Sequence, residues 1–196
     1  DETYYKILVP EKNSKGKGVR KGYLWVVVGI NTRMIYLLYD DGSRSEKVIL
    51  NELGGCKGII QSDGYSPYRK LESDAYPHIT RIPCLQHIKR KFIDCGEDEP
   101  DAKRIVELIN TLYQNEHKHK IGVDGWTVEQ NLVHRKKYAP DILGEIKDVL
   151  DDIEERGDLL PKSELKEAVT YLRNEWNAVV DIFNYGDTYL DNNIVE

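Results

Sequence analysis

The period of the hydrophobic pattern changes along the chain, and this change constrains the fold more than any other feature. Residues 4–9, 22–30 and 33–39 are rich in β-branched and aromatic side chains, which favours three strands. Only Asn31 and Thr32 separate the last two, so we predict a hairpin there and an antiparallel meander overall. In the second half apolar residues instead recur at spacings of three and four, which is typical of helices.

A second kind of strand pairing is predicted for the segment that follows the meander. Ser43-Arg44-Ser45-Glu46 has the pattern of a capping box, and the helix that it starts should end near Gly54-Gly55. Residues 58–62 and 78–82 then have the composition of strands, the first of a kind buried on both faces. A strand, helix, strand order implies a right-handed crossover and a parallel pair. We therefore predict an α/β fold with a mixed sheet, three antiparallel strands first and parallel strands after them.

The helical half shows three apolar faces of helical period, over residues 102–113, 143–153 and 165–183. Gly157 is a candidate C-cap for the second helix, and Pro161-Lys162-Ser163 is a candidate start for the third. We expect the intervening loop, residues 116–126, to be the least ordered part of the chain.

Charge is divided unevenly between the two halves. Residues 1–96 hold 16 Lys and Arg against 11 Asp and Glu, whereas residues 97–196 hold 12 against 23, which gives net charges of +5 and −11. This asymmetry favours an anionic partner for the first part, including its basic loop at residues 11–21, and a solvated helical body for the second.

Cysteine usage and hydropathy indicate a soluble protein of a reducing compartment. The three cysteines, Cys56, Cys84 and Cys95, are odd in number and form no paired framework, which fits a cytoplasmic setting. The most apolar run, residues 23–30, is far shorter than the roughly 20 residues that span a bilayer. Cys84, His87 and Cys95 could suggest zinc, but a fourth ligand at a fitting spacing is absent from the sequence.

Three acids raise the question of catalysis. Asp63 ends a predicted strand within Gln61-Ser62-Asp63-Gly64-Tyr65, where an Asp-Gly turn alone would explain it. If the first and fourth strands are neighbours, however, Asp1 and Asp63 lie side by side, and a helix packed against that edge could bring in Glu196. Three carboxylates so close together repel one another and stay ionised only around a cation. The pattern then predicts a metal site.

Four motifs in order resemble the catalytic domain of the insertion-sequence sixty-six family of DDE transposases. They are Asp1-Glu2-Thr3, Gln61-Ser62-Asp63-Gly64-Tyr65, the stretch Cys84-Leu85-Gln86-His87-Ile88-Lys89-Arg90-Lys91-Phe92, and Asp191-Asn192-Asn193-Ile194-Val195-Glu196. The resemblance covers essentially the whole chain. It implies an RNase H-like fold with a mixed five-stranded sheet and a helical insertion between the second and third acids.

The resemblance also implies a division of the chain and a cofactor. Residues 1–96 would form the core with the first two acids, residues 97–185 the insertion, and residues 186–196 the start of the helix that carries the third acid. Asp1, Asp63 and Glu196 would be the catalytic residues and would hold two Mg²⁺ ions, with Mn²⁺ as a substitute. Two such ions suit in-line displacement at phosphorus.

The implied function is metal-dependent DNA cleavage and strand transfer, with transposon ends and target DNA as partners, in a homo-oligomer without membrane contact. The setting would be the bacterial cytoplasm, in association with the nucleoid. His87, Lys89, Arg90 and Lys91 are candidates for phosphate contact, although a solvated basic turn explains them equally well. The main alternative is a non-catalytic, nucleic-acid-binding remnant of a mobile element. A glycoside hydrolase fits less well because few aromatic residues are present to line a sugar cleft.

Overall fold

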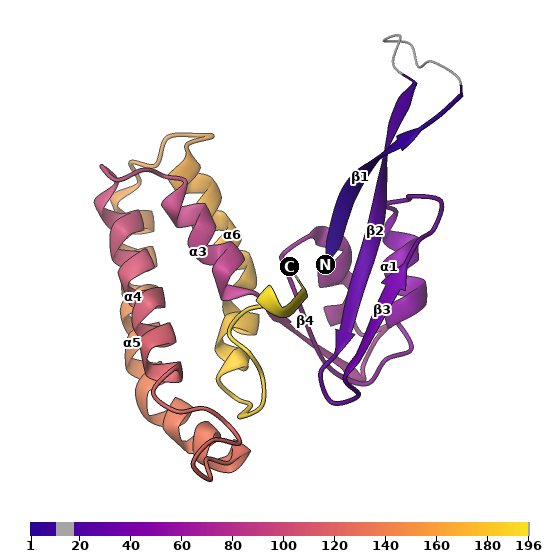
Figure 1. The fold of residues 1–196 in the computed structure, drawn as a ribbon. Helices are drawn as coiled ribbons and strands as arrows, with labels where there is room; N and C mark the ends of the chain where they lie inside the picture. The colour runs from indigo at the N-terminus through magenta and orange to yellow at the C-terminus, as the bar shows by residue number, and fades with distance from the viewer. Residues whose placement is uncertain (11–17, 196) are drawn as a thin grey trace. The chain divides into compact units, whose positions relative to one another are not determined.

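The computed structural model describes residues 1–10 and 18–195, so most of the predicted basic loop and Glu196 lie outside the described residues. The chain forms two compact units. The first, here called the sheet unit, comprises Asp1–Arg81 and the residues from Asn192 onward, and the second, the helical unit, comprises Ile82–Asp191 (Figure 1). The three-part division at residues 96 and 185 stays a prediction.

The predicted meander is confirmed in the sheet unit. Its three strands pair in the order β1-β2-β3 and are antiparallel. Their bounds are β1 Glu2–Leu8, β2 Val19–Gly29 and β3 Met34–Leu38. The register places Glu2 opposite Trp25, whose indole is fully buried and donates from Nε1 to the Ser43 carbonyl oxygen at 3.0 Å.

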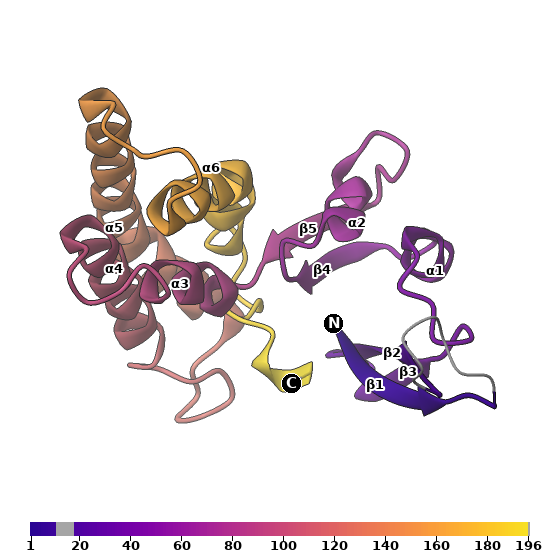
Figure 2. The ribbon, with the colours of Figure 1, turned by 90° about the horizontal axis from the view of Figure 1, so that it is seen from above.

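The second strand pair also forms, but as a sheet of its own. Its strands are β4 Gly58–Ser62 and β5 Ile79–Pro83. The Gly58 N–H donates to the His78 carbonyl oxygen at 2.8 Å, so the two strands start side by side and run parallel (Figure 2). Around them lie α1 Glu46–Leu53, α2 Ser66–Arg69 and the 3-10 helix η1 Lys70–Glu72.

The single five-stranded sheet is not confirmed, since among the described residues β1 does not pair with β4. The strand at residues 58–62 was expected to be buried on both faces, and this was wrong: Ile59 is 38% exposed and only Ser62 is buried. Side-chain packing connects the two sheets instead. Trp25 of β2, Ile49 of α1, Tyr68 of α2 and Ile79 of β5 share one apolar cluster.

The first helix begins two residues later than the predicted capping box. Its N-cap is Ser45, whose hydroxyl accepts from the Lys47 N–H at 3.3 Å, while Ser43 Oγ accepts from the Ser45 N–H at 3.1 Å. Ser43 instead uses its carbonyl oxygen to accept from the Trp25 indole and its hydroxyl to accept from the Ser45 N–H. The helix ends at Gly54, as predicted.

The helical unit packs its helices around one apolar core, to which the predicted faces contribute. Its helices are α3 Leu85–Ile93, α4 Pro100–Glu116, α5 Val128–Arg156 and α6 Glu164–Ile182. Gly157 caps α5 with a φ of 63°, and the Ser163 hydroxyl caps α6, both as predicted. No helix in the described part of the chain is long and apolar enough to cross a bilayer.

The loop between α4 and α5, predicted from the sequence to be the least ordered part of the chain, contains specific contacts. His119 stacks on Trp126 with ring centroids 3.8 Å apart, and the Gly122 N–H donates to the Trp126 carbonyl oxygen at 2.9 Å. Thr127 then starts α5 with a capping box to Gln130. The stacking of His119 on Trp126 is a contact that the polar composition of the loop did not predict.

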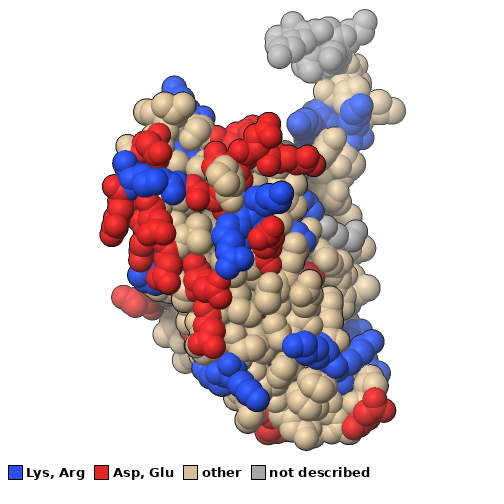
Figure 3. Space-filling view, turned by 90° about the vertical axis from the view of Figure 1, so that its left-hand side faces the viewer, with Lys and Arg blue, Asp and Glu red and all other residues tan. Residues whose placement is uncertain are grey.

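Acidic side chains gather over the face of the helical unit shown in Figure 3, interspersed with Lys and Arg. Some of these acids form ion pairs between helices: Glu145 pairs with Arg104, and Asp151 pairs with Arg173. Such exposed pairs contribute little stability each, so this surface is best understood as a solvated one.

Candidate functional site

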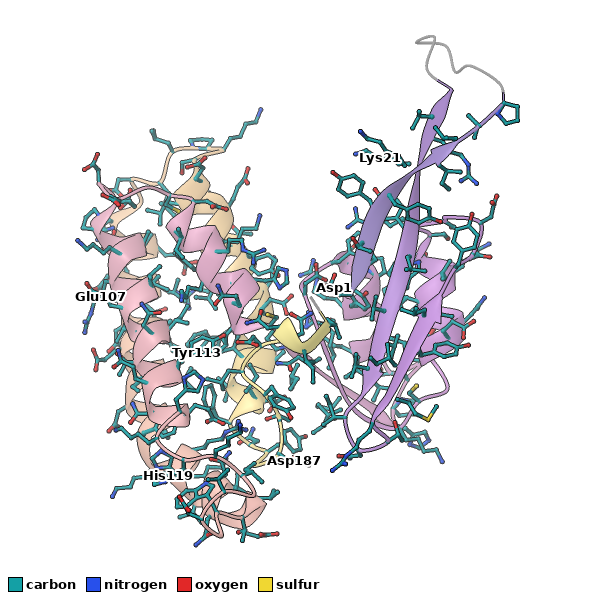
Figure 4. The ribbon with its side chains drawn as sticks, in the orientation of Figure 1. Asp1, Lys21, Glu107, Tyr113, His119 and Asp187 are labelled. Carbon is teal, nitrogen blue, oxygen red and sulfur yellow. The ribbon has the colours of Figure 1, made fainter. Side chains whose placement is uncertain are left out.

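Asp1 lies directly before β1 and continues its pairing with β2 (Figure 4). The Val26 N–H donates to the Asp1 carbonyl oxygen at 2.8 Å, and the Asp1 nitrogen donates to the Val26 carbonyl oxygen at 3.1 Å. The carboxylate is also held: Oδ1 accepts from the Glu2 N–H at 2.7 Å, and Oδ2 accepts from Nδ2 of Asn192 at 3.3 Å. Two donors therefore fix the orientation of this side chain.

Asp63 directly follows β4 and shapes the turn into α2. Its Oδ1 accepts from the Tyr65 N–H at 3.0 Å, which is the local bond that favours Asp in turns. Its carbonyl oxygen accepts from the Ser62 hydroxyl at 2.9 Å and from Nη2 of the buried Arg81 at 3.4 Å. The turn that the sequence suggested is therefore present, and its hydrogen bond is accepted by Oδ1 rather than Oδ2 of Asp63.

Asp63 has an electrostatic influence near the start of β1, although β4 and β1 are not paired among the described residues. Burial, followed by the charges of Glu2 and Asp63, raises the pKa of Tyr68 well above its ordinary value. The charge of Asp63 thus acts on the Tyr68 phenol, whose hydroxyl donates to Glu2, the first residue of β1.

Glu2 forms a buried network that the sequence analysis missed. Its side chain is 4% exposed and receives Nη2 and Nε of Arg44 on Oε1, at 2.5 and 2.8 Å. The Tyr68 hydroxyl donates to Oε2 at 3.3 Å, and the Arg44 guanidinium lies 4.2 Å from the centroid of the Tyr65 ring. Adjacency to Asp1 was the only signal in the sequence. The network therefore holds β1 at Glu2, the residue next to the candidate metal ligand Asp1.

The chemistry of Asp1 and Asp63 fits a hard divalent cation. Carboxylate oxygens are the ligands that Mg²⁺ prefers, and a carboxylate that accepts one or two hydrogen bonds keeps further lone pairs. Across residues 1–10 and 18–195 no group of three His, Cys, Asp or Glu side chains is arranged to hold a metal ion. Glu196, the proposed third ligand, is not among those residues, so its role stays a prediction.

The predicted phosphate-contacting residues all lie on α3 but not in one line. At about 100° per residue, Arg90 projects away from the buried stripe, while Lys89 and Lys91 flank it on opposite sides. Nζ of Lys89 lies 5.7 Å from the centroid of the Tyr113 ring on α4. His87 is half-buried and Lys91 is exposed. The four side chains therefore do not form a single basic face.

Zinc is not supported by the geometry of the cysteines. Cys84 is the N-cap of α3, and Cys95 follows the C-terminal end of that helix. Nine helical residues span about 14 Å, which is too far for one tetrahedral ion whose ligand distances are about 2 Å.

Comparison with known proteins identifies the relatives of this chain. Residues 1–196 match the family described as Transposase IS66 family. Two proteins of Sinorhizobium fredii are similar: the uncharacterized protein y4jD is 28% identical over 79% of this chain and 30% of its own length, and the uncharacterized protein y4qI is 26% identical over 100% of this chain and 37% of its own length.

The chain thus spans about a third of the length of these relatives. No solved structure matches it significantly. The family match covers every residue, including Asp1, Asp63 and the α3 motif described above. The chain therefore belongs to the IS66 family of transposases.

Proposed function

We propose that this chain is the catalytic part of a DDE-type DNA transposase that cleaves and joins DNA strands. Asp1, Asp63 and Glu196 are the proposed metal ligands and catalytic residues, and the two proposed ions are Mg²⁺, with Mn²⁺ as a substitute. Residues 97–185 are the proposed insertion between the second and third acids. DNA ends, target DNA and further copies of the chain are the proposed partners.

The observation that supports this proposal is that the Asp1 and Asp63 carboxylates of the sheet unit are each held by hydrogen bonds. Asp1 precedes β1 and Asp63 follows β4, and each carboxylate accepts a hydrogen bond from a backbone N–H. Burial, followed by the charges of Glu2 and Asp63, raises the pKa of the Tyr68 phenol, which donates to Glu2. Carboxylates held in a fixed orientation are suitable ligands for a hard divalent cation.

The residues of the site have separate tasks in this scheme. Bound divalent ions would supply charge that stabilises the attacking and leaving oxygens at phosphorus. Asn192 and the Glu2 N–H hold the Asp1 carboxylate, and the Tyr65 N–H holds that of Asp63. Orientation in advance of substrate binding lowers the reorganisation cost of the reaction. The Glu2 network with Arg44 and Tyr68 supports Asp1 from the side of the core.

A remnant that binds nucleic acid without cutting it is the competing function. It would retain the fold and α3 but would not require the Asp1 carboxylate to be held by both Glu2 and Asn192. That double support favours the catalytic proposal.

Plasmid nicking by the full-length protein in Mn²⁺ tests the proposal. Asp63→Asn keeps the shape of the side chain and removes its charge, so nicking should be lost while the circular dichroism spectrum is unchanged. Asp74→Asn is the matched control, because Asp74 is an exposed acid of the same unit. Wild-type nicking by the Asp63→Asn protein would exclude Asp63 as a ligand, and absence of nicking in the wild-type protein would favour the remnant.

A further inference from the structure

Strand β3 is the free edge of the meander, and its apolar side chains are exposed on both faces of the sheet. In the described part of the chain β3 pairs with β2 and with no other strand (Figure 1). Its sequence is Met-Ile-Tyr-Leu-Leu, and its first four residues are each 52–71% exposed. Only Leu38 packs against the apolar cluster around Trp25. Most of this strand is therefore uncovered within the sheet unit.

Edge strands usually carry a feature that prevents pairing with another chain, such as a charged side chain, a proline or a bulge. The opposite edge of the meander has such features, because β1 contains Lys6 and Pro10 follows the strand closely. Strand β3 contains neither a charged residue nor a proline. An unprotected apolar edge of this kind is a template for a further strand.

The contacts of β2 show which backbone groups of β3 point outward. Asp1 and Val26 exchange two hydrogen bonds, at 2.8 and 3.1 Å, so the N–H and C=O groups of Val26 point toward β1. The direction alternates along an antiparallel strand, so the groups of Val27 point toward its β3 partner, Tyr36. The same alternation on β3 turns the groups of Tyr36 toward β2, and those of its two neighbours point away from the sheet.

These neighbours, Ile35 and Leu37, present their donors and acceptors symmetrically about Tyr36. An antiparallel copy of the same strand, related by a two-fold axis beside Tyr36, places Ile35 opposite Leu37 of the second copy. The symmetry places Leu37 opposite Ile35 of the second copy as well. Each of these two pairs can exchange two hydrogen bonds. The same register places apolar side chains opposite apolar side chains along the whole strand, which stabilises a strand pair.

The charges that flank β3 favour the antiparallel direction. Arg33 directly precedes the strand, Asp40 follows its last residue by two positions, and both side chains are exposed. Antiparallel pairing brings Arg33 of one copy to the end at which the other copy carries Asp40. Parallel pairing would instead bring like charges together. The edge is thus complementary to itself in its hydrogen-bonding groups, its apolar side chains and its charges.

We propose that the outward edge of β3 binds the same edge of a second copy of this chain, which joins two three-stranded sheets into one antiparallel sheet of six strands. The same patch serves both copies, so the assembly closes as a dimer. Few residues take part compared with the roughly 20–30 a side of a standard interface, so the dimer is weak and depends on concentration. The proposed function names further copies of the chain as partners; this inference assigns them a surface and does not depend on DNA cleavage.

Disulfide trapping of the full-length protein tests the register. Facing Cα atoms of a non-hydrogen-bonded antiparallel pair are about 4.5 Å apart, which a disulfide can bridge. Tyr36→Cys should therefore form a covalent dimer under mild oxidation, in a Cys56→Ser background that lacks this exposed thiol. Met34→Cys is the matched control: Met34 is also exposed, but its counterpart in the second copy is four residues out of register, about 14 Å along the strand.

Sedimentation equilibrium of the full-length protein tests the surface without a crosslink. The Ile35→Lys, Leu37→Lys protein places like charges opposite each other twice and should dimerise more weakly than the wild type. The Ile35→Glu, Leu37→Lys protein places opposite charges there and should dimerise at least about tenfold more tightly than the first variant. Leu8→Lys, on the exposed part of β1, is the control and should leave the dissociation constant unchanged.

A wild-type protein that stays monomeric would overturn the inference, and slow amide exchange at Ile35 and Leu37 would then show that another segment of the chain covers the edge. Equal affinities of the two charged variants, or equal crosslinking of Tyr36→Cys and Met34→Cys, would overturn it too. Plasmid nicking is measured separately. A protein that dimerises through β3 without nicking DNA would refute only the proposed function.

Discussion

Removal of one hydroxyl group at Tyr68 should measurably loosen the start of β1. In the Tyr68→Phe protein the ring keeps its packing against Trp25 and Tyr65, but Glu2 loses a donor to Oε2. Burial and nearby carboxylates raise the pKa of Tyr68, so the hydroxyl stays protonated and donates throughout the accessible pH range. The substitution therefore removes one hydrogen bond to a buried charge and little else.

The magnitude follows from burial and geometry. Hydrogen bonds to charged groups contribute about 1.5–3 kcal/mol to folding. The 3.3 Å distance between the Tyr68 hydroxyl and Oε2 is long, and Arg44 continues to pair with Oε1, so the lower end of that range applies. A loss of about 1.5 kcal/mol corresponds to roughly tenfold faster exchange of an amide that opens with the sheet.

Amide exchange in β2, followed by NMR, is the assay. Tyr65→Phe is the control, because the Tyr65 hydroxyl makes an exposed bond of 3.4 Å to the Arg44 carbonyl oxygen. Its loss should cost no more than about 0.5 kcal/mol, the usual range for surface changes. Equal effects of the two substitutions, or no effect of Tyr68→Phe, would refute the argument that Glu2 is held as a buried carboxylate.

The remaining predictions concern the helical unit. Burial alone would raise the pKa of Glu116, but the hydrogen bonds and charge of Arg135 outweigh it, so this ion pair stabilises the unit above the ordinary glutamate pKa of about 4.3, and the stability is lost as pH falls through the lower native value. The stability difference between wild type and Glu116→Gln, measured by urea unfolding, should therefore narrow on acidification; a constant difference would contradict the assignment. Replacing Lys89, Arg90 and Lys91 together by Ala should weaken DNA binding for all sequences alike and flatten its salt dependence, as expected for phosphate contacts. Lys89→Ala alone should have the smallest effect, since its ammonium lies over Tyr113; an unchanged salt slope in the triple variant would assign these residues to a solvated face.

The elements that local sequence determines were predictable. The meander, the parallel strand pair and the ends of helices at Gly54 and Gly157 depend on neighbouring residues, on short turns and on glycine. The start of the first helix was predicted two residues too early because two serines, Ser43 and Ser45, both suit an N-cap, and the local pattern does not distinguish them.

Contacts between residues distant in sequence were the part that could not be predicted. The pairing of β1 with β4 would be such a contact, and packing through α1 and α2 connects the two sheets instead. Glu2 and Arg44 are 42 residues apart, and Arg135 and Thr188 are 53 apart. The hydrophobic periodicity of the sequence does not reveal such pairs. Asp63 was recognisable because a strand that ends in an acid is a local pattern, whereas its influence on Tyr68 depends on the tertiary fold.

The central claim is that Asp1 and Asp63, with Glu196, hold divalent ions for DNA cleavage. Its most direct test is anomalous scattering from crystals of the full-length protein grown with Mn²⁺ and an oligonucleotide duplex. The account predicts manganese peaks in contact with carboxylate oxygens of both Asp1 and Asp63, and their loss in the Asp63→Asn protein. Manganese bound only elsewhere, or bound at Asp1 unchanged when Asp63 is replaced by Asn, would contradict it.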